Sequence, residues 1–196
     1  MIEAMEQRRS IRAYEDRPVS RELLEEILRA GTLAPSSKNR QPWRFVVVTG
    51  QAKAEMLAVM KAGLEREKTA PLLPDSRQHL AGAERTREIM EQAPAVIFVL
   101  NPLGLDLYAP LTPEERIFEL CNIQSAGAAL ENMTLAAAEL GLGSLWICDV
   151  FFAYQELTEW LNAKGGLLAA LAVGYAAENP PPRPRKPVET VTEWRT

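Results

Sequence analysis

Hydrophobic and polar residues alternate along this chain with two periods, one typical of helices and one of strands. Helical spacing of apolar residues marks five segments, near residues 2–7, 20–31, 52–68, 114–140 and 154–161. Short apolar runs predict four buried strands, near residues 45–49, 95–100, 144–148 and 168–173. Because helices and strands follow one another irregularly, we expect an α+β fold, a mixed α/β sandwich.

Local signals refine these elements. Ser20 is placed to cap the helix that Gly31 closes. The polar stretch 75–92 is expected to be helical and exposed. Segment 114–140 is rich in alanine and apolar over most of its circumference, so it predicts a long, buried central helix that ends at Gly141.

Prolines mark two irregular segments. The stretch 101–113 contains three prolines and a glycine, which is typical of a loop or a lid. Residues 180–187 hold five of the fourteen prolines, so this part is expected to run as an extended arm. Residues 188–194 could add a strand.

Size and charge narrow the class of protein. A chain of 196 residues is expected to form one domain, 1–196, with 180–196 as its C-terminal arm. The net charge of −4 argues against general binding to nucleic acid or to an anionic membrane. No apolar run approaches the ~20 residues of a membrane span, and no signal-peptide core is evident at the N-terminus. A cytoplasmic protein is therefore expected.

Metal and triad chemistry are not indicated. Cys121 and Cys148 lack the spacing of a metal site or a redox pair, and we expect reduced thiols. His79 is the only histidine, which excludes a site built from several histidines and argues against a Ser-His-Asp triad. We therefore predict no metal site.

Two segments near the start carry the candidate chemistry. Arg8-Arg9-Ser10-Ile11-Arg12 offers three guanidinium groups and a hydroxyl, a donor set that suits a phosphate. The loop Ala34–Trp43 is polar, is bracketed by prolines and precedes a buried strand, so it can hold hydrogen-bonding groups in a fixed geometry. Together they predict a site for a ligand with an anionic end and an aromatic end.

The proline-rich arm carries two more basic residues, Arg183 and Arg185, which could fold back to join the first segment around a phosphate. A plainer interpretation stays open at this point, in which these arginines are surface charges paired with Glu15, Asp16 or Glu189. Pro35-Ser36-Ser37 could likewise be a simple turn before a strand.

Four segments, in this order, resemble the nitroreductase family of FMN flavoproteins. They are Arg8–Arg12, Ala34–Trp43, Asn132–Trp146 and Arg183–Pro187. The resemblance implies a mainly antiparallel central sheet flanked by helices, and a C-terminal arm exchanged between subunits. It also implies a homodimer with FMN in two interface sites, each built from both chains.

The resemblance also implies roles for individual residues. Arg8, Ser10 and Arg12 would contact the phosphate and ribityl chain, Arg9 would act largely through its backbone, and Arg183 and Arg185 would complete the phosphate site. The loop of the partner subunit would approach the same flavin through Pro35, Ser36, Ser37 and Asn39. A backbone N–H of Cys148-Asp149 would face flavin N5, and Ser125 occupies a position where relatives often carry an acidic or amide residue.

The implied function is ping-pong electron transfer from NADH or NADPH, through FMN, to a nitroaromatic, a quinone or another small conjugated acceptor. No catalytic side chain is predicted. Alternatives within the family are flavin-consuming enzymes of the benzimidazole-forming kind and reductive dehalogenases. Alternatives from other classes are a flavin-binding module without turnover and an interaction protein that uses its proline-rich arm.

Overall fold

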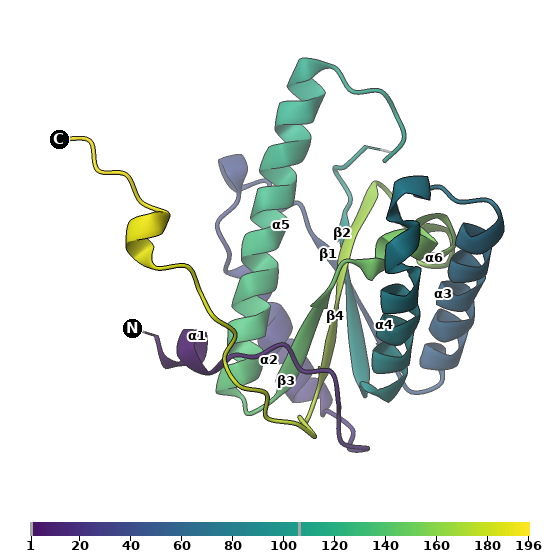
Figure 1. Ribbon diagram of the computed structural model, residues 1–196, viewed down its shortest axis with the longest axis horizontal. Coiled ribbons are helices and arrows are strands. Elements are labelled where there is room, and N and C mark those ends of the chain that lie inside the picture. Colours follow the sequence, from purple (N-terminus) through teal and green to yellow (C-terminus); the bar gives the residue numbers. More distant parts are fainter. Residues whose placement is uncertain (1, 106) are drawn as a thin grey trace.

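In the part of the chain that the structure describes, four antiparallel strands form the centre of the molecule (Figure 1). The computed structural model describes residues 2–105 and 107–196. The strand order is β1-β2-β4-β3, and the strands are β1 (Arg44–Thr49), β2 (Ala95–Asn101), β3 (Gly143–Ile147) and β4 (Gly166–Gly174). Each pair of neighbours is antiparallel, so the predicted sheet is confirmed. The apolar runs located every strand to within two residues.

Helices cover both faces of this sheet (Figure 1). One face carries α2 (Arg21–Thr32) and α5 (Pro113–Glu139), and the other carries α3 (Ala52–Thr69), α4 (Leu80–Gln92) and α6 (Tyr154–Trp160). The short α1 (Glu3–Gln7) packs against α5. The described residues also include four 3₁₀ turns: η1 (Ser37–Asn39), η2 (Pro74–His79), η3 (Asp149–Ala153) and η4 (Val188–Thr190). The layers confirm the predicted mixed α/β sandwich.

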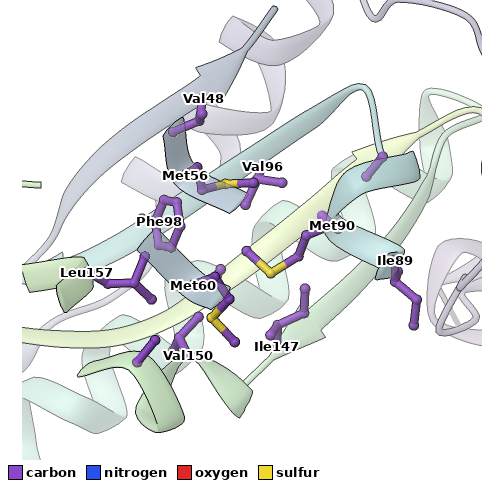
Figure 2. Packing of buried hydrophobic residues seen from close by; sticks show 14 of the residues in the cluster. Val48, Met56, Met60, Ile89, Met90, Val96, Phe98, Ile147, Val150 and Leu157 are labelled. Carbon is purple, nitrogen blue, oxygen red and sulfur yellow. The ribbon is translucent and has the colours of Figure 1, made fainter. Parts of the chain in front are cut away.

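Strand β2 separates two hydrophobic cores because successive side chains point to opposite faces. Ile97 and Val99 face α2 and α5. Val96 and Phe98 face α3 and α6 instead, and Figure 2 shows both packed near Met56 and Met60 of α3. All seven residues of β2 are buried. A strand covered on both faces reads as a continuous apolar run, which is why the sequence located it well.

Helix α5 has well-defined ends. Thr112 caps its start through a capping box with Glu115. At the other end the Gly141 N–H donates to Ala138 O and the Leu142 N–H donates to Ala137 O, which is a Schellman motif. Gly141 has φ +73°, a conformation that glycine adopts without steric cost. The predicted helix stop at Gly141 is confirmed.

Two of the predicted helices differ from expectation. The helix capped by Ser20 continues through Gly31 to Thr32. A Cβ at Gly31 would lie 2.9 Å from Met133 of α5, so this glycine permits close helix packing and does not close the helix. Helix α4 is not simply exposed, because four of its side chains are buried: Ala83, Thr86, Ile89 and Met90.

The predicted burial of the central helix holds for only part of its length. The C-terminal half of α5 packs on the sheet, while its N-terminal half extends beyond the sheet (Figure 1). Four large apolar side chains there are 44–59% exposed: Ile117, Phe118, Leu120 and Ile123. One chain therefore leaves an apolar helix face uncovered.

The C-terminal arm runs away from the body of the molecule without a regular element between Pro180 and Pro187 (Figure 1). Residues 188–190 form η4, and in the described chain 188–194 pair with no strand, so the expectation of a strand there is wrong for a single chain. Stretch 101–113 is largely a loop, as predicted; Asp106 within it lies outside the described residues. None of the described helices combines the length and apolarity needed to cross a membrane.

A buried carboxylate fixes the turn after α3. Glu67, whose side chain is 1% exposed, forms an ion pair with Arg66 and accepts hydrogen bonds from the N–H groups of Leu72 (3.0 Å) and Leu73 (3.2 Å). Arg66 in turn binds Glu156 at 2.7 Å. Burial alone would raise the pKa of Glu67, but the hydrogen bonds from Arg66 and from the two backbone N–H groups together hold this pKa below its ordinary value.

We expect Glu67→Gln to lower the free energy of unfolding by about 2 kcal/mol, because the amide loses the charge that strengthens these bonds. A lowered pKa means that the stabilisation is present above the ordinary value of 4.5 and disappears as the pH falls through the lowered value. Denaturant unfolding at pH 7 and at pH 3 would measure this, with the exposed Glu65→Gln as control. An equal loss at both pH values would contradict the assignment.

Candidate functional site

A pocket of about 390 Å³ collects basic residues from both ends of the chain. Its lining from the N-terminal segment includes Arg8, Arg9, Ser10 and Arg12, and its lining from the arm includes Arg183 and Arg185. The arm also contributes Pro180, Pro181 and Pro182. All six polar residues that the resemblance assigned to the phosphate end of a flavin therefore border one pocket.

Backbone pairing explains why the two ends meet. Ser10 forms a parallel bridge with Ser144 of β3, and the Ile11 N–H donates to Ser144 O at 3.0 Å. Further along, Tyr14 forms an antiparallel bridge with Ala176, two residues after the end of β4. The N-terminal segment thus runs beside the chain that leads into the arm, and the arm begins next to the arginines.

Basic side chains outnumber acidic ones in the pocket, where five arginines and one carboxylate residue, Glu6, belong to the lining. None of its five arginines lies within ion-pair distance of a carboxylate in the described ranges, so the alternative pairing with Glu15, Asp16 or Glu189 is not observed. The Arg9 guanidinium donates to the carbonyls of Glu6 (2.6 Å) and Arg8 (2.9 Å). A phosphate dianion would suit this donor set.

The loop Ala34–Trp43 has an unusual backbone. Lys38, Asn39 and Gln41 have φ values of 51–53°, a region that residues other than glycine rarely occupy. Hydrogen bonds within the loop support it, because the Gln41 N–H donates to Ser36 Oγ at 3.0 Å. The cluster of positive φ values makes a simple turn before a strand a poor description, and strained backbone of this kind often marks a binding site.

Ser125 ties this loop to helix α5. The Ser37 N–H donates to Ser125 Oγ at 3.2 Å, and the Ser125 hydroxyl donates to Cys121 O at 2.7 Å. Ser125 is buried and both contacts are internal, so within one chain it positions the loop. Pro35 and Asn39 are exposed beside it.

The loop and the basic pocket lie at different points along α5. The loop contacts the helix at Ser125. A second hollow adjoins the basic pocket and shares Arg8 and Arg9 with it, and this hollow is lined by Ala138 of the same helix. Thirteen residues at 1.5 Å each separate these positions by about 20 Å. One chain therefore does not bring the two predicted halves of the site together.

The end of β3 holds the remaining predicted residues. Cys148 follows the strand and is exposed, and Asp149 begins η3. Its thiol is nevertheless partly shielded from water by neighbouring groups. This partial burial, and then the charge of Asp149, raise the pKa of the Cys148 thiol above its ordinary value, so this cysteine is not an activated nucleophile. The Asp149 carboxylate accepts a hydrogen bond from the Thr86 hydroxyl at 2.5 Å.

Two contacts at these sites were not predicted. Glu178 accepts a hydrogen bond from the Arg12 N–H at 2.5 Å and so connects the start of the arm to the basic segment. Thr86 reaches Asp149 from a helix 63 residues earlier. An acidic residue two positions before the first proline of the arm is a weak signal for the first contact, and no local pattern could reveal the second.

A larger hollow, of about 760 Å³, lies away from all of these residues. It borders β1, the strand at one edge of the sheet, and is lined in part by Leu24, Leu28 and Val47. None of the predicted site residues lines it. Volume alone therefore does not identify the candidate site, whereas the donor chemistry of the basic pocket does.

Two known proteins with similar sequences are reductases by name. A protein of Archaeoglobus fulgidus, assigned as an NADH dehydrogenase/NAD(P)H nitroreductase, is 36% identical over 140 residues, which are 71% of this chain and 62% of that protein. FMN reductase [NAD(P)H] of Bacillus subtilis is 29% identical over 198 residues, covering 100% of this chain and 74% of the relative.

Solved structures share the fold. The crystal structure of a Desulfovibrio desulfuricans protein, assigned as a nitroreductase and in complex with FMN, superimposes with a TM-score of 0.72 at 30% identity. The match covers 99% of this chain and 95% of that one. The model of the nitroreductase family matches residues 5–175, which contain the first basic segment, the loop and the end of β3 but not the arm. The resemblance is thereby confirmed, and this chain belongs to the nitroreductase family.

Proposed function

We propose that this chain is a single-domain, FMN-dependent NAD(P)H oxidoreductase that passes electrons to nitroaromatics, quinones or another small conjugated acceptor. The observation that carries the proposal is the basic pocket, where arginines from both ends of the chain converge and, among the described residues, none of their guanidinium groups forms an ion pair with a carboxylate. The names of the relatives and the FMN-bound structure support it.

The residues present fit FMN. Arg8, Arg12, Arg183 and Arg185 supply guanidinium groups for the phosphate, and Ser10 adds a hydroxyl. The guanidinium groups of Arg9 and Arg185 each donate to two carbonyls of their own segments. Arg9 is proposed to contribute largely through its backbone, as the resemblance implies. The backbone of Cys148 and Asp149 is proposed to face flavin N5.

When bound, FMN supplies the redox chemistry, accepting a hydride from NAD(P)H and delivering electrons to the acceptor in a ping-pong cycle. The chain holds and orients the cofactor and leaves one face of the ring accessible. No side chain is assigned as a general acid or base.

A homodimer completes the site. Since the loop and the basic pocket are about 20 Å apart along α5, a two-fold pairing of α5 helices would bring the loop of one chain to the pocket of the other. Pro35, Ser36, Ser37 and Asn39 would then approach FMN from the partner, held by Ser125. The exposed apolar face of α5 supports this pairing, because an uncovered patch of this kind is typical of an interface.

The C-terminal arm is proposed to cross onto the partner. Three of its apolar side chains, Val188, Val191 and Trp194, are 63–84% exposed in one chain. The hollow beside β1 offers apolar side chains and an unpaired strand edge against which the partner's arm could pack. The cytoplasmic location stays a prediction from the sequence.

Anaerobic mixing of the purified protein with NADH or NADPH tests the proposed function. We expect a yellow protein whose released cofactor is FMN, and rapid bleaching of the bound flavin that an added quinone or nitroaromatic reverses. A flavin that neither nucleotide reduces would indicate a binding module without turnover. A colourless protein that takes up no added FMN would refute the proposal.

A further inference from the structure

The carboxylate of Asp149 is held by a hydroxyl group from another helix. Thr86 lies on α4 and is 8% exposed, and its hydroxyl donates to Asp149 Oδ2 at 2.5 Å. Ile89 and Met90, on the next turn of α4, are packed in the core (Figure 2). A buried threonine on a well-packed helix presents its hydroxyl in a fixed position, so this bond determines where the Asp149 side chain lies.

The position of this carboxylate matters if the proposed function holds, since the inference rests on it. Asp149 is one of the two adjacent residues, with Cys148, whose backbone is proposed to face flavin N5. An aspartate side chain readily accepts a hydrogen bond from a nearby backbone N–H, and would then compete with the flavin for that donor. A negative charge turned toward the ring would also oppose the addition of electrons to it.

We infer that Thr86 is a positioning residue for the flavin site: its hydroxyl keeps the Asp149 carboxylate on the side of α4, so that the backbone N–H stays available and the negative charge stays off the ring. The negative charge of Asp149 acts on the adjacent residue, where it contributes to raising the pKa of the Cys148 thiol. A carboxylate so close to the proposed N5 contact is tolerated because its direction is fixed.

Thr86→Val removes the hydroxyl and keeps the shape of the side chain. We expect the dissociation constant of the apoprotein for FMN to rise about tenfold, a factor typical for loss of a hydrogen bond to a charged group. We also expect the midpoint potential of bound FMN to become more negative. Thr86→Ser keeps a hydroxyl and should restore both values. Flavin fluorescence titration and equilibration with a reference dye measure them, and thermal unfolding of the apoprotein checks the fold.

Asp149→Asn separates the effect of charge from that of packing. Because an amide carries no charge, adding Thr86→Val to Asp149→Asn should shift the potential no further. If Thr86→Val unfolds the apoprotein, Thr86→Ala removes the same hydroxyl and carries the same expectations.

Two results would overturn the inference while leaving the proposed function intact. One is a Thr86→Val protein that binds FMN with the affinity and potential of the wild type. The other is a shift of potential that persists in full in the Asp149→Asn background, because Thr86 would then act independently of the charge. A wild-type protein that binds no FMN would overturn the proposed function, and this inference with it.

Discussion

Replacing Arg8 and Arg183 together with alanine is expected to weaken FMN binding about a thousandfold. The two arginines come from opposite ends of the chain and line the same pocket. Each charge-assisted hydrogen bond to a phosphate contributes about 1.5–3 kcal/mol, so loss of two corresponds to about 3–6 kcal/mol, and a thousandfold change, about 4 kcal/mol, lies within that range. Flavin fluorescence titration of the apoprotein would measure the change, and each single substitution should account for about half of it in free energy.

A matched control is available on the same chain. Arg29 on α2 and Arg195 near the end of the arm have side chains that are 70% and 86% exposed and line no part of the basic pocket. Replacing both with alanine changes the net charge by the same amount. Loss of FMN from this control to the same extent would show that general charge, and not the pocket, governs binding.

Truncation after Asn179 is expected to abolish FMN binding and to weaken the dimer at least a hundredfold. The deletion removes Arg183 and Arg185 from the basic pocket and three exposed apolar side chains from the arm. Burial of a valine or a larger apolar side chain contributes about 1.5–3 kcal/mol, and part of this is offset by ordering of the arm. Sedimentation over a concentration series, followed at flavin and protein wavelengths, would measure both effects.

A second truncation, after Lys186, separates the two roles of the arm. It retains both arginines but removes Val188, Val191 and Trp194. We expect a weakened dimer that regains FMN when the protein is concentrated, in contrast to the shorter form. A fully dimeric protein after either truncation would contradict the proposed exchange of arms.

The sequence predicted the sheet and the basic pocket for identifiable reasons. Strands β2 and β4 are covered on both faces, so they read as continuous apolar runs that are easily located in the sequence. The residue types of the arginines match a phosphate, but on that ground alone a set of ordinary surface charges stays open, and the family resemblance is what assigns them to one site. The prolines of the arm exclude a helix that would carry Arg183 elsewhere.

Other features depend on contacts that no local pattern encodes. Gly31 looks like a helix stop, but its lack of a side chain allows Met133 to approach, 102 residues later. The buried face of α4 is not evident from the sequence because two of the residues on it, Ala83 and Thr86, are small or polar. The positive φ values at Lys38 and Asn39 fall on residues other than glycine, so no composition signal marks them. Because α5 is apolar over most of its circumference, the sequence indicates that the helix must be covered by other protein. The sequence does not indicate whether the same chain or a partner covers it.

About 20 Å of α5 separates the loop from the basic pocket within one chain, so retention of FMN should depend on how concentrated the protein is. Dilution below the dissociation constant of the dimer would leave each chain without the loop groups that the partner supplies to the cofactor, and by mass action FMN would be released. Added FMN should in turn favour assembly. Flavin released on serial dilution would thus report subunit dissociation without any attached label.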